Sequence, residues 1–368
     1  MPRSALASRL RNLNQENPMT ISHYIGFDVH KKSVSYCVKA ADGTIIEAGK
    51  LRATHLALRE WAGKRQEPWH GAMEATLFSG WIYDTLKPFA AELQIGNPSM
   101  MKAIATAKKK NDRLDARKIA DLVRCNLLPV CYVASVEMRE LRRLLRYRNT
   151  VVAHAVRTKN KMSGLLMEVG AEYSKQRLHG KKYFTELMGQ LEEVPESVKD
   201  MLKLSRSALE MFETTQRKLL DRLQKEPLLA KRVELLRSIG GVGEVTALTW
   251  ALETSDPRRF PSMGDAMSYC GLTSALVSSA DKQRRGPISK QRNRHLQTVL
   301  IEAAKLAPRW NQQLAEIHER ELKRGNRNRA TLAVARKLVA YLLAVDKSGK
   351  PFEIRKPAVT EMEADKVA

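Results

Sequence analysis

The stretch that decides the fold is HYIGFDVHKKSVSYCVKAADGTIIEAGKL, residues 23–51. Its first part, YIGFDV, is apolar apart from one acid, Asp28, and SVSYCVKA alternates as a half-buried strand does. The Asp-Gly pair in ADGT is a turn signal, and the strand pattern resumes in IIEAGKL. We therefore predict two or three antiparallel strands at the start of an ordered domain.

Helices and strands alternate after these first strands. Helical patterns and short apolar runs follow one another, in the order helix 55–65, strand 69–76, helix 80–93, strand 93–100 and a helix opened by NDRLDARKIADL at 111–122. The alternation predicts an α/β domain over residues 21–132.

Long helices replace this pattern beyond residue 132. Amphipathic stretches at 138–170 and 198–227 predict a coiled-coil or helical linker over 133–234, followed by a mostly helical domain over 235–355. Polar segments at 1–20 and 356–368 are predicted to be flexible or disordered. The second stretch carries an apolar seam that fits either a hairpin within the chain or an interface between copies: Met201, Leu204, Ala208, Met211, Thr215, Leu219 and Leu223.

The charge balance predicts a polyanionic partner. The 368 residues include 64 Lys or Arg against 40 Asp or Glu, a net charge of +24, which favours nucleic acid over an anionic membrane. No apolar run of eighteen residues and no secretory signal is visible, and the four cysteines lack a zinc-site spacing. These features predict a cytoplasmic protein without membrane association.

Four carboxylates stand where they can serve one site. Asp28 lies in the first predicted strand and Glu74 in a later one, while Asp112 and Asp115 share one face at the start of a helix. Hard carboxylate oxygens suit Mg²⁺ or Mn²⁺, which acts on phosphodiesters. In the alternative interpretation, Asp112 and Asp115 only cap the helix and form salt bridges. The neighbouring bases would hold a phosphate backbone: Lys108, Lys109, Lys110, Arg113 and Arg117.

Residues 235–253, LLRSIGGVGEVTALTWALE, have a helix-hairpin-helix pattern. Gly241 and Gly243 allow a tight turn, after which the amides at the next helix start can face a phosphate. A plain glycine-rich connection between two helices is the alternative.

Residues 281–296, DKQRRGPISKQRNRHL, predict a basic loop that runs into a helix. Ser289 lies at its centre and could be a phosphate ligand or a nucleophile. Chemistry alone favours the ligand, because no activating base for its hydroxyl is visible in the sequence. The phosphate-binding candidates around it are Arg284, Arg285, Lys290, Arg292 and Arg294.

The motifs YIGFDVHK, MEAT, NDRLDARKIADL, SIGGVGEVTALTWALE, SYCGLTS and GPISKQRN occur in this order over nearly the whole chain. Together they resemble insertion-sequence transposases that join an N-terminal RuvC-like domain of DEDD type to a C-terminal serine transposase domain. The resemblance implies an RNase H-like fold, a coiled-coil linker and a mostly helical domain with the helix-hairpin-helix motif. It implies that Asp28, Glu74, Asp112 and Asp115 are the acidic tetrad, and that Ser289 is the catalytic serine.

The resemblance also implies the partners: an element-encoded guide RNA, donor and target DNA, and dimers that join into tetramers, in the bacterial cytoplasm at the nucleoid. Two positions depart from the family pattern, since Arg292 stands where Gly is frequent and Ser274 where Pro is frequent. Ser278 and Ser279 are the second candidates for the nucleophile. An RNA-guided recombinase is thus expected, and the alternatives are a metal-dependent endonuclease of Holliday-junction-resolvase type and a non-catalytic binding protein.

Overall fold

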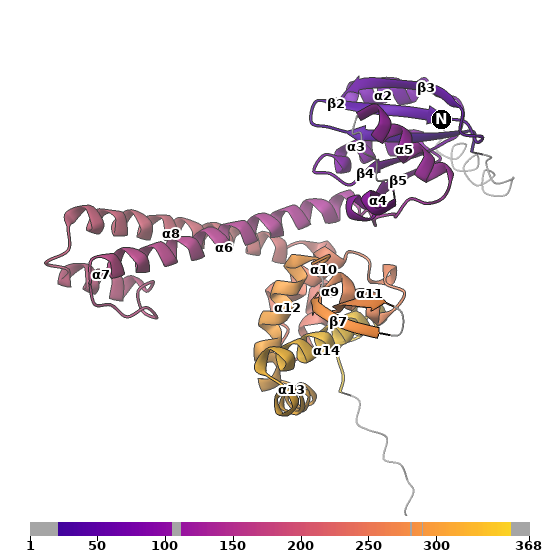
Figure 1. The fold of residues 1–368 in the computed structure, drawn as a ribbon. Coiled ribbons are helices and arrows are strands. Elements are labelled where there is room, and N and C mark those ends of the chain that lie inside the picture. The colour runs from indigo at the N-terminus through magenta and orange to yellow at the C-terminus, as the bar shows by residue number, and fades with distance from the viewer. Residues whose placement is uncertain (1–20, 105–111, 280–281, 289, 355–368) are drawn as a thin grey trace, which may run out of the picture. The chain divides into compact units, whose positions relative to one another are not determined.

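The computed structural model describes residues 21–104, 112–279, 282–288 and 290–354. Within these ranges the side chains of 103–104, 112–114, 275–279, 282–285 and 287 are not described. The chain divides between Val133 and Ala134 into two compact units (Figure 1). Over the described ranges, no helix is both long and apolar enough to cross a membrane.

The first unit is built on a five-stranded mixed sheet in the order β3-β2-β1-β4-β5. Its strands are β1 (His23–Val29), β2 (Ser33–Lys39), β3 (Ile45–Arg52), β4 (Trp69–Glu74) and β5 (Glu92–Gly96). The first three form the predicted antiparallel meander, and β4 and β5 extend the sheet from β1 in parallel.

Helices cover both faces of this sheet. Ile25, Phe27 and Val29 of β1 point to one face, where they pack with α2 (His55–Gly63) and α3 (Ser79–Leu86), which the short helix η1 (Lys87–Phe89) follows. The other face carries α4 (Pro98–Ile104) and α5 (Asp112–Arg124), whose apolar residues pack against Ala72 of β4. Alternation along β1 therefore gives Gly26 and Asp28 to the face of α5.

A long helical arm opens the second unit. It consists of α6 (Val136–Glu168), α7 (Lys181–Gln190) and α8 (Glu196–Gln224), and α6 is one unbroken helix of 33 residues. Helices α6 and α8 lie side by side, with α7 at their far end (Figure 1). The far end has its own hydrophobic cluster, to which Leu166, Leu187 and Leu202 contribute one residue from each helix.

The predicted apolar seam of α8 does not form the hairpin. The residues of α8 buried against the rest of the arm are Val198, Leu202 and Leu209, which are displaced around the helix from that seam. Leu204 is 71% exposed and Met211 58%, and Leu223 is the seam residue that is buried. The hairpin interpretation of the seam is therefore wrong.

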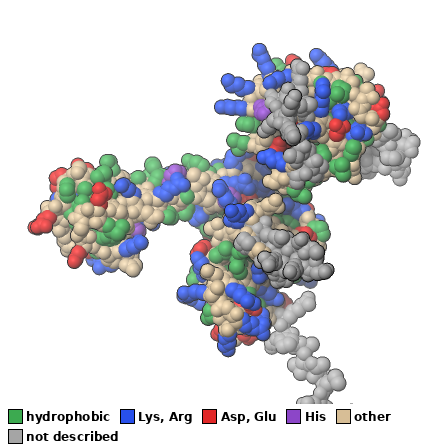
Figure 2. Space-filling view, viewed as in Figure 1, with side chains coloured by type: hydrophobic (Ala, Val, Ile, Leu, Met, Phe, Trp, Pro, Cys, Tyr) green, Lys and Arg blue, Asp and Glu red, His purple; other side chains and the backbone are tan. Residues whose placement is uncertain are grey.

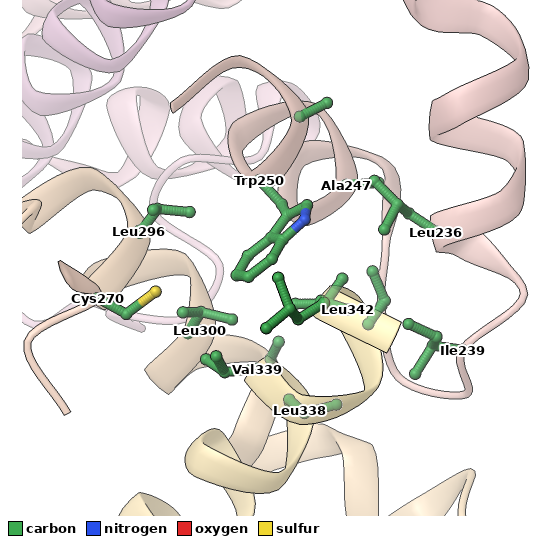
Figure 3. Packing of buried hydrophobic residues seen from close by; sticks show 14 of the residues in the cluster. Leu236, Ile239, Ala247, Trp250, Cys270, Leu296, Leu300, Leu338, Val339 and Leu342 are labelled. Carbon is green, nitrogen blue, oxygen red and sulfur yellow. The ribbon is translucent and has the colours of Figure 1, made fainter. Parts of the chain in front are cut away.

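The rest of the second unit is mostly helical. Its elements are α9 (Pro227–Arg237), α10 (Glu244–Thr254), η2 (Pro257–Arg259), α11 (Met263–Tyr269), β6 (Ser274–Ser279), β7 (Lys282–Ile288), α12 (Arg294–Leu306), η3 (Ala307–Arg309), α13 (Gln312–Arg324) and α14 (Arg327–Ser348). Trp250, Leu300 and Leu342 meet at the centre of its core (Figure 3). The base of α6 belongs to the same core through Leu141 and Leu145. An α/β domain followed by a mostly helical region is therefore confirmed.

One predicted loop is a strand. Residues 282–288, expected to form a basic loop, are β7, which pairs antiparallel with β6. The prediction failed because Lys, Arg, Gly and Pro dominate this segment and hide any strand pattern.

Candidate catalytic and nucleic-acid-binding sites

Asp28 and Glu74 lie on adjacent parallel strands at the same end of the sheet. Phe27 of β1 is paired with Met73 of β4, so Asp28 and Glu74 are the next residues of the two strands. The carboxyl ends of parallel strands meet at one edge, and side chains at matched positions share a face. Both carboxylates therefore leave the sheet on the side of α5.

Asp28 is held by its surroundings. Its side chain is 13% exposed, and its Oδ2 lies 3.0 Å from Nε2 of His30, an exposed residue just beyond β1. A short contact of this kind restricts the rotation of the carboxylate.

Helix α5 lies in direct contact with β1. A Cβ atom at Gly26 would come within 2.1 Å of the carbonyl oxygen of Ala116. Farther along α5, Asp121 accepts a 2.6 Å hydrogen bond from Nζ of Lys39, and Lys39 is paired with Tyr24 near the start of β1. The helix therefore runs opposite to β1, and its first turn lies toward the end of β1 that carries Asp28.

The first turns of α5 bring the remaining acids to this edge. Asp115 directly precedes Ala116, and its Oδ1 lies 3.7 Å from Nζ of Lys118, in a partly exposed ion pair. Asp112 is the first residue of α5, and its side chain lies outside the described part of the chain. The fold thus directs Asp28, Glu74 and the start of α5 to one end of the sheet.

The donor chemistry at this edge suits a hard divalent cation, because carboxylate oxygens are the preferred ligands of Mg²⁺ and Mn²⁺. Among the residues that the structure describes, no three His, Cys, Asp or Glu side chains are grouped closely enough to hold an ion. The described carboxylates include Asp28, Glu74 and Asp115 but not Asp112. The residue types and the edge therefore fit a metal, whereas the described side chains do not form a closed site.

The basic residues predicted around the acids differ in what is described. Lys108, Lys109 and Lys110 lie outside the described residues, as does the side chain of Arg113. Arg117 is half-buried on α5, and its Nε atom is buried with no hydrogen-bond partner among the described residues. A bound phosphate oxygen is one group that would satisfy such a donor.

The serine segment follows β7. Ser289 lies outside the described residues, and for Ser278, Ser279, Arg284 and Arg285 only the backbone is described, in β6 and β7. The predicted phosphate-binding residues Lys290, Arg292 and Arg294 are all exposed on its far side.

Arg292 fits its position because of a glycine opposite. Gly271 has φ of +69°, and a Cβ atom there would lie 2.5 Å from Cβ of Arg292. The absence of a side chain at Gly271 therefore accommodates the larger residue. The other departure from the family pattern, Ser274, is the first residue of β6.

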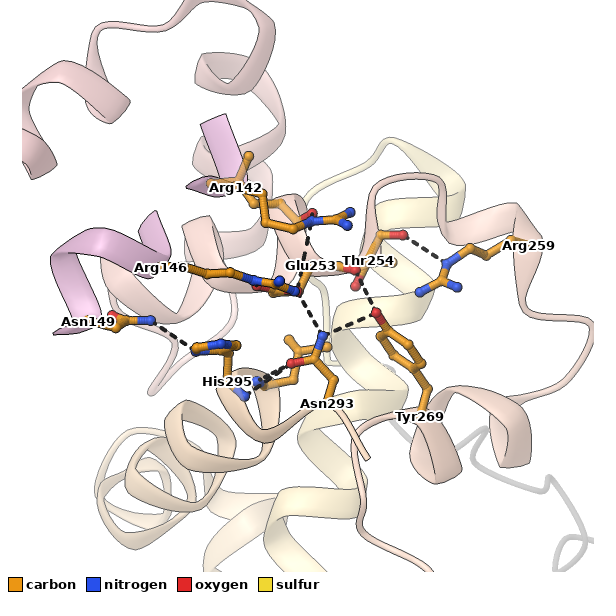
Figure 4. A network of polar contacts seen from close by, with 11 residues as sticks. Arg142, Arg146, Asn149, Glu253, Thr254, Arg259, Tyr269, Asn293 and His295 are labelled. Carbon is orange, nitrogen blue, oxygen red and sulfur yellow. Dashed lines mark hydrogen bonds and ion pairs between the residues drawn. The ribbon is translucent and has the colours of Figure 1, made fainter. Parts of the chain in front are cut away.

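A buried carboxylate lies just beyond this segment, and the sequence interpretation missed it (Figure 4). Glu253 of α10 is fully buried, and Arg146 of α6 donates to both its oxygens, with Nε to Oε1 and Nη2 to Oε2 at 2.7 Å each. Burial alone raises the pKa of Glu253, but the hydrogen bonds and charge of Arg146 lower it below its ordinary value. The same hydrogen bonds raise the pKa of Arg146.

Asn293 joins this carboxylate to the serine segment. Its Nδ2 donates to Oε2 of Glu253 at 2.8 Å and to Oη of Tyr269 at 3.1 Å. Its Oδ1 caps α12 by accepting from the amides of His295 and Leu296, at 3.0 and 3.2 Å. A lone acid in an apolar helix, together with two arginines four residues apart on α6, was the available sequence signal.

The glycine loop between α9 and α10 has the geometry that its sequence predicted. Gly241 has φ of +90°, and a Cβ atom there would lie 2.5 Å from the backbone of Ala307, so only glycine fits. Gly243 is the N-cap of α10 and provides no side-chain cap to the first-turn amides. Ala247 is fully buried, as expected for the inward residue of the motif.

Lysine and arginine side chains are numerous on the face of each unit seen in Figure 2, with fewer acids among them. On α6 alone, eight Lys or Arg accompany three Glu. This is the charge pattern expected of a surface that meets phosphate groups.

Comparison with known proteins finds similarity on both units. Residues 25–170 match a model of the DEDD transposase domain of IS110 elements, and residues 233–319 match the model described as transposase IS116/IS110/IS902 family. The transposase for insertion sequence element IS1111A of Coxiella burnetii is 26% identical over 281 residues, covering 74% of this chain and 76% of its own. The transposase for insertion sequence element IS1328 of Yersinia enterocolitica is 22% identical over 336 residues, covering 89% and 98%.

Proposed function

We propose that this chain, whose two matched regions both support a transposase of the IS110 kind, cuts and exchanges DNA strands with a serine nucleophile and an acidic metal site. The observation that carries the proposal is the placement of the two matches. One covers the acidic edge of the sheet, and the other covers the segment of Ser289.

The acidic tetrad Asp28, Glu74, Asp112 and Asp115 would hold Mg²⁺ or Mn²⁺. When bound, such an ion offsets charge on a phosphodiester and favours the deprotonated form of an oxygen that it contacts. The chain's own contribution is to fix the carboxylates on two strand ends and one helix start, with His30 orienting Asp28. The strand order, an antiparallel meander joined to two parallel strands, supports an RNase H-like, RuvC-like fold.

Ser289 would attack a DNA phosphate. Its Oγ–P bond would form as a P–O bond of the phosphodiester breaks, the hydroxyl would lose its proton, and the leaving oxygen would gain one. Lys290, Arg292 and Arg294 are exposed beside it, where they would offset the charge that develops on the phosphate.

An element-encoded guide RNA would select donor and target DNA. The net charge of +24 and the basic helix α6 support binding of several phosphates at once. The uncapped start of α10, beside Gly241 and Gly243, would bind a further phosphate without reading sequence.

The exposed seam on α8 would join two copies of the chain. Leu204 and Met211 lie on the side of α8 that does not face its own hairpin, and an apolar stripe of this kind is typical of a helical interface. Dimers joined in this way would pair further into tetramers.

The test is a search for a covalent protein–DNA adduct with the full chain, its guide RNA, labelled DNA and Mg²⁺. The wild type should form an adduct whose nucleotide maps by mass spectrometry to the peptide with GPISK. Ser289→Ala should bind RNA and DNA and form none. Clean 3′-hydroxyl and 5′-phosphate ends without an adduct would instead show a metal-dependent endonuclease, and attachment to Ser278 or Ser279 would move the nucleophile.

A further inference from the structure

We infer that Glu253 is a positioning residue for the reaction at Ser289, acting through Asn293. The inference rests on the proposed function, because it assigns a purpose to residues that contact neither DNA nor a metal in the described structure. Four residues separate Ser289 from Asn293, so the position of Asn293 limits where the serine can lie.

Asn293 is fixed from three directions. Besides its contact with Glu253, its amide N–H donates to the backbone oxygen of Tyr269 at 2.8 Å, and its Oδ1 holds the first turn of α12. Tyr269 is in turn anchored, since its hydroxyl donates to the backbone oxygen of Glu253 at 3.1 Å. The end of the serine segment is therefore attached to α10, α11 and α12 together (Figure 4).

Glu253 also attaches this junction to α6. Arg146 binds both carboxylate oxygens, and Arg142 donates from Nε to the backbone oxygen of Leu252 at 2.9 Å, with the same atom 3.8 Å from Oε2 of Glu253. A fully buried carboxylate is costly unless it is paired and hydrogen-bonded, as this one is. An uncharged apolar residue would fill the core at lower cost, so stability alone gives little reason for an acid here.

Amide and carboxylate can be exchanged to test this contact. In Glu253→Gln, one oxygen becomes an NH₂ group, which must face a donor of either Arg146 or Asn293. In Asn293→Asp, two carboxylates meet where a 2.8 Å hydrogen bond stood. In the double variant, the new amide at position 253 can donate to the new carboxylate at position 293. That carboxylate still caps α12, since Asp is a favoured N-cap residue.

The readouts are the rate of adduct formation, the affinity for guide RNA and DNA, the thermal midpoint, and amide exchange at His295 and Leu296, all on the full chain. Each single variant should form adduct about tenfold to about 10²-fold more slowly, the loss that a misplacement of about 1 Å produces, with affinities unchanged at temperatures where it is folded. Amide exchange should accelerate in Glu253→Gln. The double variant should recover most of both losses.

Glu302→Gln is the matched control, because Glu302 is an exposed carboxylate of α12 that pairs with Lys305 at 2.6 Å. It should change none of the four readouts. Losses that follow the folded fraction alone, with no recovery in the double variant, would overturn the positioning role. Normal exchange at His295 and Leu296 in Glu253→Gln would also overturn it, whether or not the chain forms adducts. An exchange response in a wild type that forms no adduct would instead refute the serine chemistry.

Discussion

Replacing Gly26 by alanine should separate helix α5 from the sheet and disable the acidic site. Gly26 is a buried contact point between β1 and α5, and a Cβ atom there would lie 2.1 Å from the oxygen of Ala116 and 2.4 Å from the nitrogen of Ala120. Both are backbone atoms, so no side-chain rotation can relieve the clash. The helix itself must retreat.

The size of the effect follows from these distances. A methyl carbon needs roughly 3.3 Å from an oxygen, so α5 must move by roughly 1 Å. Overpacking of this kind costs about 1–3 kcal/mol, which lowers the melting temperature of a unit of this size by about 4–12 °C. Asp115 directly precedes Ala116 and moves with it, and a displacement of about 1 Å can slow a reaction about 10²-fold.

The assay is calorimetry of the full chain together with strand exchange measured well below the first melting transition. Gly164→Ala is the control, since it lies within α6, where no heavy atom would come within 4 Å of a Cβ atom. That variant should be neutral or stabilising by up to about 1 kcal/mol, because alanine is the better helix former. If Gly26→Ala melts and reacts as the wild type does, the contact of α5 with β1 does not hold the acids in place.

Four further outcomes are expected. Asp115→Ala should abolish strand exchange and leave RNA binding intact, and undiminished exchange would exclude this residue from the metal site. Affinity for nucleic acid should fall with salt at a log–log slope of about −0.7 to −0.9 for each phosphate contact, and a flat response would contradict a charge-driven interface. Leu204→Glu with Met211→Glu should turn dimers into monomers in light scattering without lowering the melting temperature; unchanged dimers would place the interface elsewhere. The pKa of Glu253 is lowered in the folded chain, so its stabilising effect is complete above the ordinary glutamate value of about 4.3 and is lost as pH falls through the folded value. Glu253→Gln should therefore be less stable than wild type at pH 7, and a stability difference that stays constant as pH falls from about 5 to about 3 would refute this.

Local patterns were sufficient for the N-terminal strands and the long helices. The alternation in SVSYCVKA and the Asp-Gly turn predicted the β1–β2–β3 meander, and the periodicity at 138–170 predicted α6. Both signals arise from neighbouring residues, which is why a single sequence carries them.

Features that depend on tertiary contacts were not predictable in this way. No local pattern indicates that α5 runs opposite to β1, because that orientation is set by the close approach at Gly26 and the distant pair of Lys39 and Asp121. The buried face of α8 was misassigned because two apolar stripes lie on that helix, and contact with α6 selects one of them. Glu253 was missed because its partner Arg146 lies 107 residues earlier in the chain.

The unbroken course of α6 makes it a mechanical lever. At about 1.5 Å per residue, its 33 residues span roughly 50 Å, from the core around Leu145 to the separate cluster around Leu166. A tilt of about 5° at the core end displaces the far end by about 4 Å, and a load applied at the far end returns to Arg146 as torque. Any molecule gripping the tip of the arm therefore pulls, through one rigid rod, on the carboxylate that anchors Asn293.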